Sequence, residues 1–92
     1  MVKGIMNKKW VIIFKALANI NRLKIIEMLL SGESLTVTQI SNRLDISIKS
    51  TSKHLIILQN LNLLEGEGKN GRVFYKFSKS APSDFKNIIK LL

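Results

Sequence analysis

Apolar residues recur every three or four positions through much of the chain, which is the spacing that gathers them on one side of an α-helix. Leu23, Ile26 and Leu29 follow this spacing. Asn19 before them is a typical N-terminal cap, and Gly32 after them is typical of a helix end. The same pattern and boundary residues predict helices at about residues 8–18, 19–31, 36–44, 47–61 and from 80 to the C-terminus.

Strand-like sequence replaces the helical spacing after the fourth predicted helix. Residues 63–66 and 72–77 are predicted to form two strands. They are joined by the sequence GKNGR, in which Asn70 and Gly71 strongly favour a tight hairpin turn. The residues of the second strand that are predicted to face the core are Val73, Tyr75 and Phe77.

The helix predicted at residues 47–61 begins with a basic head, residues 47–53, which carries four hydroxyls and two lysines. At about 100° per residue, Lys49, Ser52 and Lys53 point away from the apolar side of this helix. The side predicted to face the core holds Thr51, Leu55 and Leu58, with Ser47 and Ile48 near its edges. The Thr51 hydroxyl is expected to bond the carbonyl four residues back.

A short helix, a turn of a few residues, a second helix and a hairpin with a basic tip follow one another in the order of a winged helix-turn-helix. The sequence therefore predicts a mainly α fold with a small β-hairpin, as one domain over residues 1–92, that binds double-stranded DNA. Lysine and serine can bond base edges or phosphates, so Lys49, Ser52 and Lys53 are predicted to enter the major groove. The hairpin tip is predicted to reach phosphates or the minor groove through Lys69, Asn70 and Arg72.

The amino-acid composition limits the classes of partner that the chain can bind and the kinds of site that it can form. The chain of 92 residues has 15 lysines and arginines against 6 acids, a formal charge of +9, which favours a polyanionic partner such as nucleic acid or an anionic membrane surface. With no cysteine and one histidine, disulfides, thiolate metal sites and multi-histidine sites are excluded within one chain. No apolar run approaches a membrane span, and the run at residues 10–14 is too short for a signal peptide, so a cytoplasmic protein is expected. No catalytic constellation is visible, so we expect neither an enzyme nor a cofactor.

The two terminal helices carry more apolar side chains than one face of a helix can hold, which favours an interface. Pairing of two copies about a two-fold axis would set their DNA-contacting helices about 34 Å apart, one turn of DNA. The side chains predicted to form this homodimer interface are Trp10, Val11, Ile13, Phe14, Phe85, Ile88, Ile89 and Leu92.

Four blocks together resemble the arsenical-resistance repressor (ArsR/SmtB) family of winged helix regulators: FKALANINRLKIIEMLL, LTVTQISNRLDIS, STSKHLIILQNLNLL and GKNGRVFYKFS, within residues 14–78. The resemblance implies a homodimer, joined through its first and last helices, that binds an inverted repeat in a promoter and usually represses it. It also implies that the family's serine, serine, basic residue and histidine of the DNA-contacting helix correspond to Ser47, Ser52, Lys53 and His54.

The chain departs from the family at its metal sites. Both positions where metal-sensing members have cysteines in the LTVTQ block are threonine, and the last helix offers Asp84 but no histidine or glutamate. We therefore expect no metal at either site, and the sequence identifies no effector. Ile48 and Lys49 stand where many members have small polar residues, so the operator cannot be copied from relatives.

Several of these residues also have simple structural interpretations. Lys49 and Lys53 could form a solvated helix face, and Ser50 is equally well explained as a DNA contact or as a filler of the helix surface. His54 lies beside the apolar stripe, where a hydrogen-bonded structural histidine is favoured over a phosphate contact. Thr36 is better explained as the N-cap of its helix, in a capping box with the residue three positions on, than as a ligand.

Two other functions remain open from the sequence. One is a winged helix that binds a protein through Ile56 and Ile57, for example in a toxin-antitoxin or phage regulatory complex. The other is a winged helix that binds RNA or the ribosome.

Overall fold

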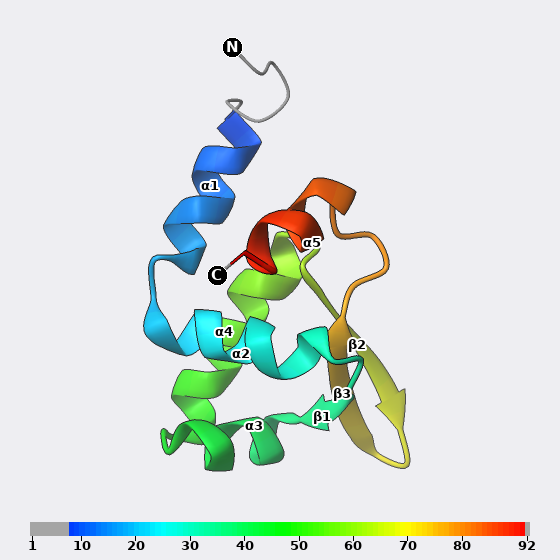
Figure 1. Ribbon diagram of the computed structural model, residues 1–92. Coiled ribbons are helices and arrows are strands. Elements are labelled where there is room, and N and C mark those ends of the chain that lie inside the picture. The colour runs from blue at the N-terminus through cyan, green and yellow to red at the C-terminus, as the bar shows by residue number, and fades with distance from the viewer. Residues whose placement is uncertain (1–7, 92) are drawn as a thin grey trace.

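Five helices and a three-stranded antiparallel sheet make up residues 8–91, the part of the chain that the computed structural model describes (Figure 1). The elements in chain order are α1 (Lys8–Leu17), α2 (Ile20–Leu30), β1 (Leu35–Thr36), α3 (Val37–Leu44), α4 (Ile48–Asn60), β2 (Leu64–Lys69), β3 (Arg72–Phe77) and α5 (Ser83–Ile89). This is the winged helix-turn-helix fold that the sequence predicts. None of the helices in residues 8–91 has the length and apolar character needed to cross a membrane.

The helix starts were predictable because their caps are local. Asn19 Oδ1 accepts hydrogen bonds from the backbone N–H groups of Asn21 and Arg22 at 3.0 and 3.2 Å. Thr36 and Gln39 form the predicted capping box, in which each side chain bonds the other's backbone N–H. These bonds satisfy N–H groups that have no partner within the helix, so they fix where each helix begins.

One core joins the helices to the base of the hairpin. Its fully buried residues include Ile25 and Ile26 from α2, Ile40 from α3, and Leu55 and Leu58 from α4. The apolar side of the α4 stem, Leu55 and Leu58, is therefore buried as predicted, which anchors the helix while the outward side of its first turns stays at the surface.

The sheet differs from the prediction in two ways. Leu35 and Thr36 form a short strand, β1, which pairs with Tyr75 and Phe74 of β3 and which the sequence did not indicate. The first hairpin strand, predicted at residues 63–66, instead runs from Leu64 to Lys69. This prediction was wrong because the turn contains only two residues, so the strand continues almost to the tip.

The hairpin, or wing, is built around positive backbone angles at its tip. Asn70 and Gly71 have φ values of 53° and 76°, the left-handed conformation that a two-residue hairpin turn requires. Of the three residues predicted to face the core, Tyr75 and Phe77 pack against it, but Val73 is 46% exposed. Val73 is exposed because the wing extends beyond the body of the domain at this point.

The terminal helices use part of their apolar surface within the single chain. Trp10, Ile13, Phe85 and Ile89 are buried in the core of the described chain, so these four side chains of the predicted dimer interface are already covered. Part of the excess of apolar residues therefore packs into the core of the single chain and does not need a partner to cover it. The side chains that remain open to a partner are discussed with the function.

The molecule has two distinct ends. Figure 1 shows α1 and α5 together at one end, and α3, the start of α4 and the wing tip at the other. The basic head of α4 and the basic hairpin tip therefore share one end of the fold.

Candidate nucleic-acid interface

The turn between α3 and α4 directs the basic head away from the core. Asp45, at the end of α3, adopts a left-handed conformation with φ 57°, and the Ile46 N–H donates to the carbonyl of Ser41 at 3.2 Å. The chain then reverses over a few residues into α4. This sharp turn leaves the outward side of the first two turns of α4 at the surface.

Two hydroxyls of the basic head stabilise the start of α4. Ser47 Oγ accepts from the Ser50 N–H at 3.0 Å, as predicted for a cap, and the buried Thr51 hydroxyl donates to the Ser47 carbonyl at 2.9 Å, also as predicted. Ser47 is itself exposed and its hydroxyl proton remains available to an acceptor such as a phosphate. The backbone of the basic head is therefore fixed before any partner binds.

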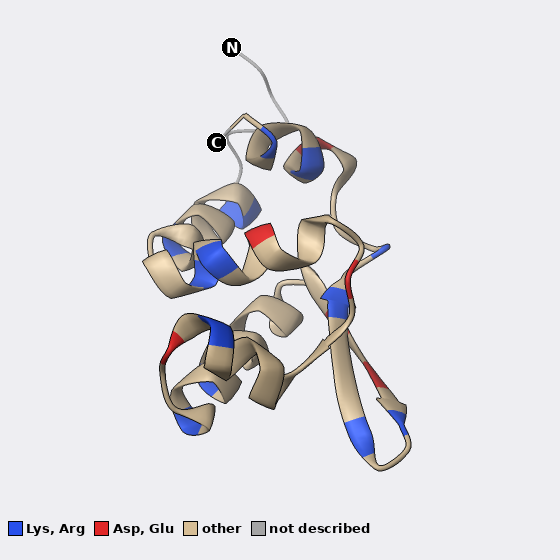
Figure 2. Ribbon diagram, turned by 60° about the horizontal axis from the view of Figure 1, so that its bottom comes forward, with Lys and Arg blue, Asp and Glu red and all other residues tan. Residues whose placement is uncertain are grey.

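Besides Arg43 of α3, which pairs with Glu33, four exposed cations lie on this end of the molecule: Lys49 and Lys53 on α4, and Lys69 and Arg72 on either side of the wing turn. None of the ion pairs within residues 8–91 involves any of these four. Figure 2 shows basic positions on both strands near the wing tip. These charges are free to bind a polyanion.

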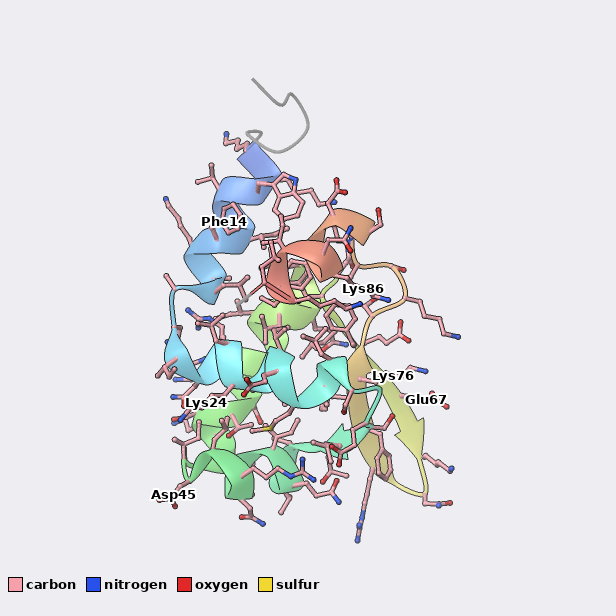
Figure 3. All side chains as sticks on the ribbon, in the orientation of Figure 1. Phe14, Lys24, Asp45, Glu67, Lys76 and Lys86 are labelled. Atoms are coloured by element: carbon pink, nitrogen blue, oxygen red, sulfur yellow. The ribbon has the colours of Figure 1, made fainter. Side chains whose placement is uncertain are left out.

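Both acidic residues of the wing pair with one lysine, Lys76. Lys76 Nζ lies 3.5 Å from Glu65 Oε1 and 3.7 Å from Glu67 Oε2, and Figure 3 shows Lys76 and Glu67 on neighbouring strands. The carboxylates of β2 therefore have a partner close to the base of the wing. Lys69 and Arg72, at the tip, take part in neither of these ion pairs.

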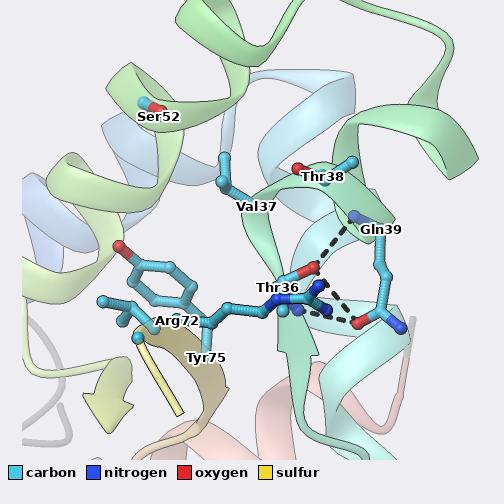
Figure 4. Close-up of a pocket in the computed structure, with 9 residues that line it drawn as sticks. Thr36, Val37, Thr38, Gln39, Ser52, Arg72 and Tyr75 are labelled. Atoms are coloured by element: carbon cyan, nitrogen blue, oxygen red, sulfur yellow. Dashed lines mark hydrogen bonds between the residues drawn. The ribbon is translucent and has the colours of Figure 1, made fainter. Parts of the chain in front are cut away.

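A hollow of about 510 Å³ separates α4 from the wing (Figure 4). Ser52 lines it from α4, Arg72 from β3, and Thr38 and Gln39 from the first turn of α3. Thr38 and Gln39 were not among the predicted contacts. The capping box predicts that this turn starts a helix, but only the fold shows that it faces Ser52 and Arg72.

His54 has a structural partner. Arg22 Nη1 lies 3.1 Å from His54 Nδ1, and because a guanidinium can only donate, Nδ1 accepts and the neutral ring carries its proton on Nε2. Arg22 Nε also donates to the carbonyl of Ala16, near the end of α1. A hydrogen-bonded chain therefore joins α1, α2 and α4, as the structural interpretation of His54 anticipated.

We expect this pairing to make stability depend on pH. Burial lowers the pKa of the His54 imidazole, and the nearby Arg22 guanidinium lowers it further. As pH falls below about 6.5, the unfolded chain binds a proton that the folded chain does not, so the free energy of unfolding falls until the lowered pKa is reached. Urea unfolding between about pH 7.5 and 5 measures this slope. His54→Gln removes the titrating group and is expected to flatten the slope; an unchanged slope would contradict the assignment.

Comparison with known proteins places these features in a family. Residues 19–65, from the cap of α2 to the start of the wing, match the bacterial regulatory protein, arsR family. The chain belongs to this family. The match spans the helix-turn-helix with its basic head, where four of the predicted contact residues lie on exposed positions: Ser47, Lys49, Ser50 and Lys53.

Two known transcription regulators align with most of the chain. The cadmium resistance transcriptional regulatory protein CadC of Listeria innocua is 39% identical over 67 residues, which cover 73% of this chain and 56% of that protein. The chain thus spans little more than half the length of this relative. The transcriptional activator HlyU of Vibrio cholerae is 38% identical over 84 residues, covering 91% of this chain and 74% of HlyU.

Solved structures of related regulators share the fold. HlyU from Vibrio cholerae superposes with a TM-score of 0.81 at 35% identity, covering 99% of this chain and 92% of that chain. A homodimeric winged helix-turn-helix DNA-binding domain from Mycobacterium bovis, a possible ArsR-family regulator, has a TM-score of 0.76 at 25% identity, covering 90% and 73% of the two chains.

The two threonines that stand where metal-sensing members have cysteines lie in different surroundings. Thr36 is nearly buried and caps α3, as predicted, while Thr38 is exposed beside the hollow. Within residues 8–91, no three histidine, cysteine, aspartate or glutamate side chains gather closely enough to hold a metal ion.

Proposed function

We propose that this chain is a homodimeric, sequence-specific DNA-binding transcription regulator, in which α4 enters the major groove and the wing contacts the neighbouring backbone. One observation carries the proposal. Four exposed cations without ion-pair partners in residues 8–91, on α4 and on the wing, share one end of a winged helix-turn-helix. A duplex is the polyanion whose grooves accept a helix and whose backbone accepts a wing at the same time.

The contacts divide into two kinds. Lys49, Ser50 and Lys53 on α4 would bond base edges or nearby phosphates, as the amino and hydroxyl groups of these residues allow. On the wing, Lys69, Asn70 and Arg72 are exposed and would contact phosphates or the minor groove. Ser52, half-buried beside the hollow, would bond a phosphate jointly with Arg72. His54 would orient α4 through Arg22, not bind DNA.

The homodimer would form at the opposite end of the molecule. On α1, Val11, Ile12 and Phe14 are each between 45 and 49% exposed, and Figure 3 shows Phe14 on that helix. Ile88 of α5 is half-buried, and Leu92 of the predicted interface lies outside the described residues. Pairing at this end leaves both basic heads open, and the related Mycobacterium bovis domain is named as a homodimer. A dimer bound across a promoter would repress it by excluding the polymerase.

A second candidate function rests on Ile56 and Ile57, which are 54 and 38% exposed on the stem of α4. Apolar side chains on that helix suit contact with another protein, as in a toxin-antitoxin or phage regulatory complex. Such a module would bind its partner without preferring any DNA sequence.

Selection of bound duplexes from a random pool tests the proposal and separates the two candidates. We expect an inverted repeat with half-sites one or more whole DNA turns apart, bound about 10³-fold or more tightly than random duplex, with affinity that falls steeply as salt rises. Absence of any enriched sequence would overturn DNA regulation in favour of the protein-contact module. Enrichment of a single unrepeated site would overturn the dimer arrangement.

A further inference from the structure

An exposed isoleucine stands near the start of the basic head. Ile48, the first residue of α4, is 51% exposed and lies outside the core cluster, although its helical angle placed it near the core-facing edge. This exposure is compatible with an edge position, because Ile48 lies in the first turn of α4, where the core cluster does not reach it. Its neighbours Ser47, Lys49 and Ser50 are all exposed polar residues.

The backbone at Ile48 is well defined. The Ser47 and Thr51 hydrogen bonds fix the backbone on either side of Ile48. Branching at Cβ also restricts χ1 of an isoleucine, so less conformational freedom remains to be lost on binding than for an unbranched side chain. Ile48 therefore presents an apolar side chain on a fixed backbone beside the cations that would hold a duplex.

The major groove offers one kind of apolar surface. Guanine, adenine and cytosine present only hydrogen-bond donors and acceptors at that edge, whereas thymine adds its C5-methyl group. An isoleucine side chain placed against the other edges would cover polar atoms without bonding them, which is unfavourable. Contact with a thymine methyl instead removes apolar surface of both partners from water.

We propose that Ile48 recognises the 5-methyl group of a thymine in each half-site of the operator, and so determines part of the sequence preference. This inference rests on the proposed DNA-binding function and assigns the base class that one side chain selects. Ile56 offers a matched comparison, since it is 54% exposed on the same helix but lies eight residues further along, about 12 Å from Ile48.

The test uses the full chain and the duplex enriched from the random pool. Each thymine is replaced in turn by deoxyuridine, which removes only the methyl group, and affinity is measured by fluorescence anisotropy. Replacing the contacted thymine is expected to weaken binding about four-fold per half-site and about fifteen-fold in both, as for the exposure of one methyl group each. Ile48→Ala on the thymine duplex is expected to weaken binding by at least as much.

The coupling between protein and base decides the result. In Ile48→Ala the same deoxyuridine duplex should bind as tightly as the thymine duplex, whereas Ile56→Ala should keep the full sensitivity of the parent. Deoxyuridine substitutions that are silent in the parent, or that act equally in Ile48→Ala, would overturn the inference while leaving the enriched operator, and so the proposed function, intact. A pool with no enriched sequence would overturn the proposed function itself.

Discussion

Replacement of Phe85 by alanine is expected to lower the melting temperature by roughly 12 °C or more. Phe85 is 1% exposed, and its ring stacks on that of Phe77 with centroids 5.9 Å apart and planes 17° apart. Loss of a fully buried phenylalanine costs about 3–5 kcal/mol, and each kcal/mol shifts Tm by about 4–8 °C in a domain of this size. The effect is large because Phe85 attaches α5 to the base of the wing.

Leu91→Ala is the matched control, because Leu91 is also a large apolar residue at the C-terminal end but is 86% exposed. Thermal unfolding of both variants and the parent, followed by circular dichroism at equal protein concentration, measures the difference. If Phe85→Ala melts within a degree or two of Leu91→Ala, α5 does not contribute to the core as its burial indicates.

The parts of the fold that the sequence predicts well depend on neighbours in the chain. Asn19, Thr36 and Ser47 each bond a backbone N–H two or three residues away, so their caps are visible in the sequence itself. The wing turn depends only on the two residues that adopt positive φ, Asn70 and Gly71.

β1 could not be predicted because it depends on residues far away in the chain. Leu35 pairs with Tyr75, forty positions later, and two residues show no alternation of their own. Thr36 also begins a helix, and this local signal conceals its place in the sheet. A strand of this kind exists only because β3 passes beside it.

The terminal helices show a different limit. α1 has apolar residues on several sides, so spacing alone does not decide that Trp10 and Ile13 face the core while Val11 and Phe14 stay exposed. That choice depends on where α2 and the rest of the core lie. The prediction of an interface treated all of these side chains alike.

The sequence predicted the cations of the candidate site but not every residue around them. Lysines and arginines stay at the surface in almost any fold, so the exposure of the cations of α4 and the wing could be inferred from the sequence. Ile48 could not be placed, because helical angles give a direction but not the depth to which neighbours cover a turn. The hollow joins Thr38, Ser52 and Arg72 from three elements, and only the packing brings them together.

Removal of both lysines of the basic head is expected to weaken operator binding at least about 30-fold for each half-site that the dimer contacts. Lys49 and Lys53 lie one helical turn apart and exposed, and each contact with a base costs about 1–3 kcal/mol when lost. The Lys49→Ala, Lys53→Ala double variant should also lose preference among operator positions, because base contacts carry the sequence information. Lys24→Ala removes one charge from α2, beside Ile89 and Lys90 of the α5 end, and should bind operator nearly as the parent does.

Arg72→Ala is expected to act differently, and the contrast between the variants tests whether α4 reads the base sequence while the wing binds the phosphate backbone. A phosphate contact is indifferent to sequence, so its loss weakens operator and random duplex alike and lowers the slope of log K against log salt by about 0.9 for each contact, or about 1.8 for the two contacts of the dimer. Anisotropy titrations of both duplexes at several salt concentrations distinguish this from the loss of preference expected for the lysines. If the lysine variant and Arg72→Ala both bind like the parent, this end of the molecule is not the DNA surface; if they exchange phenotypes, the wing selects the sequence and α4 holds the backbone.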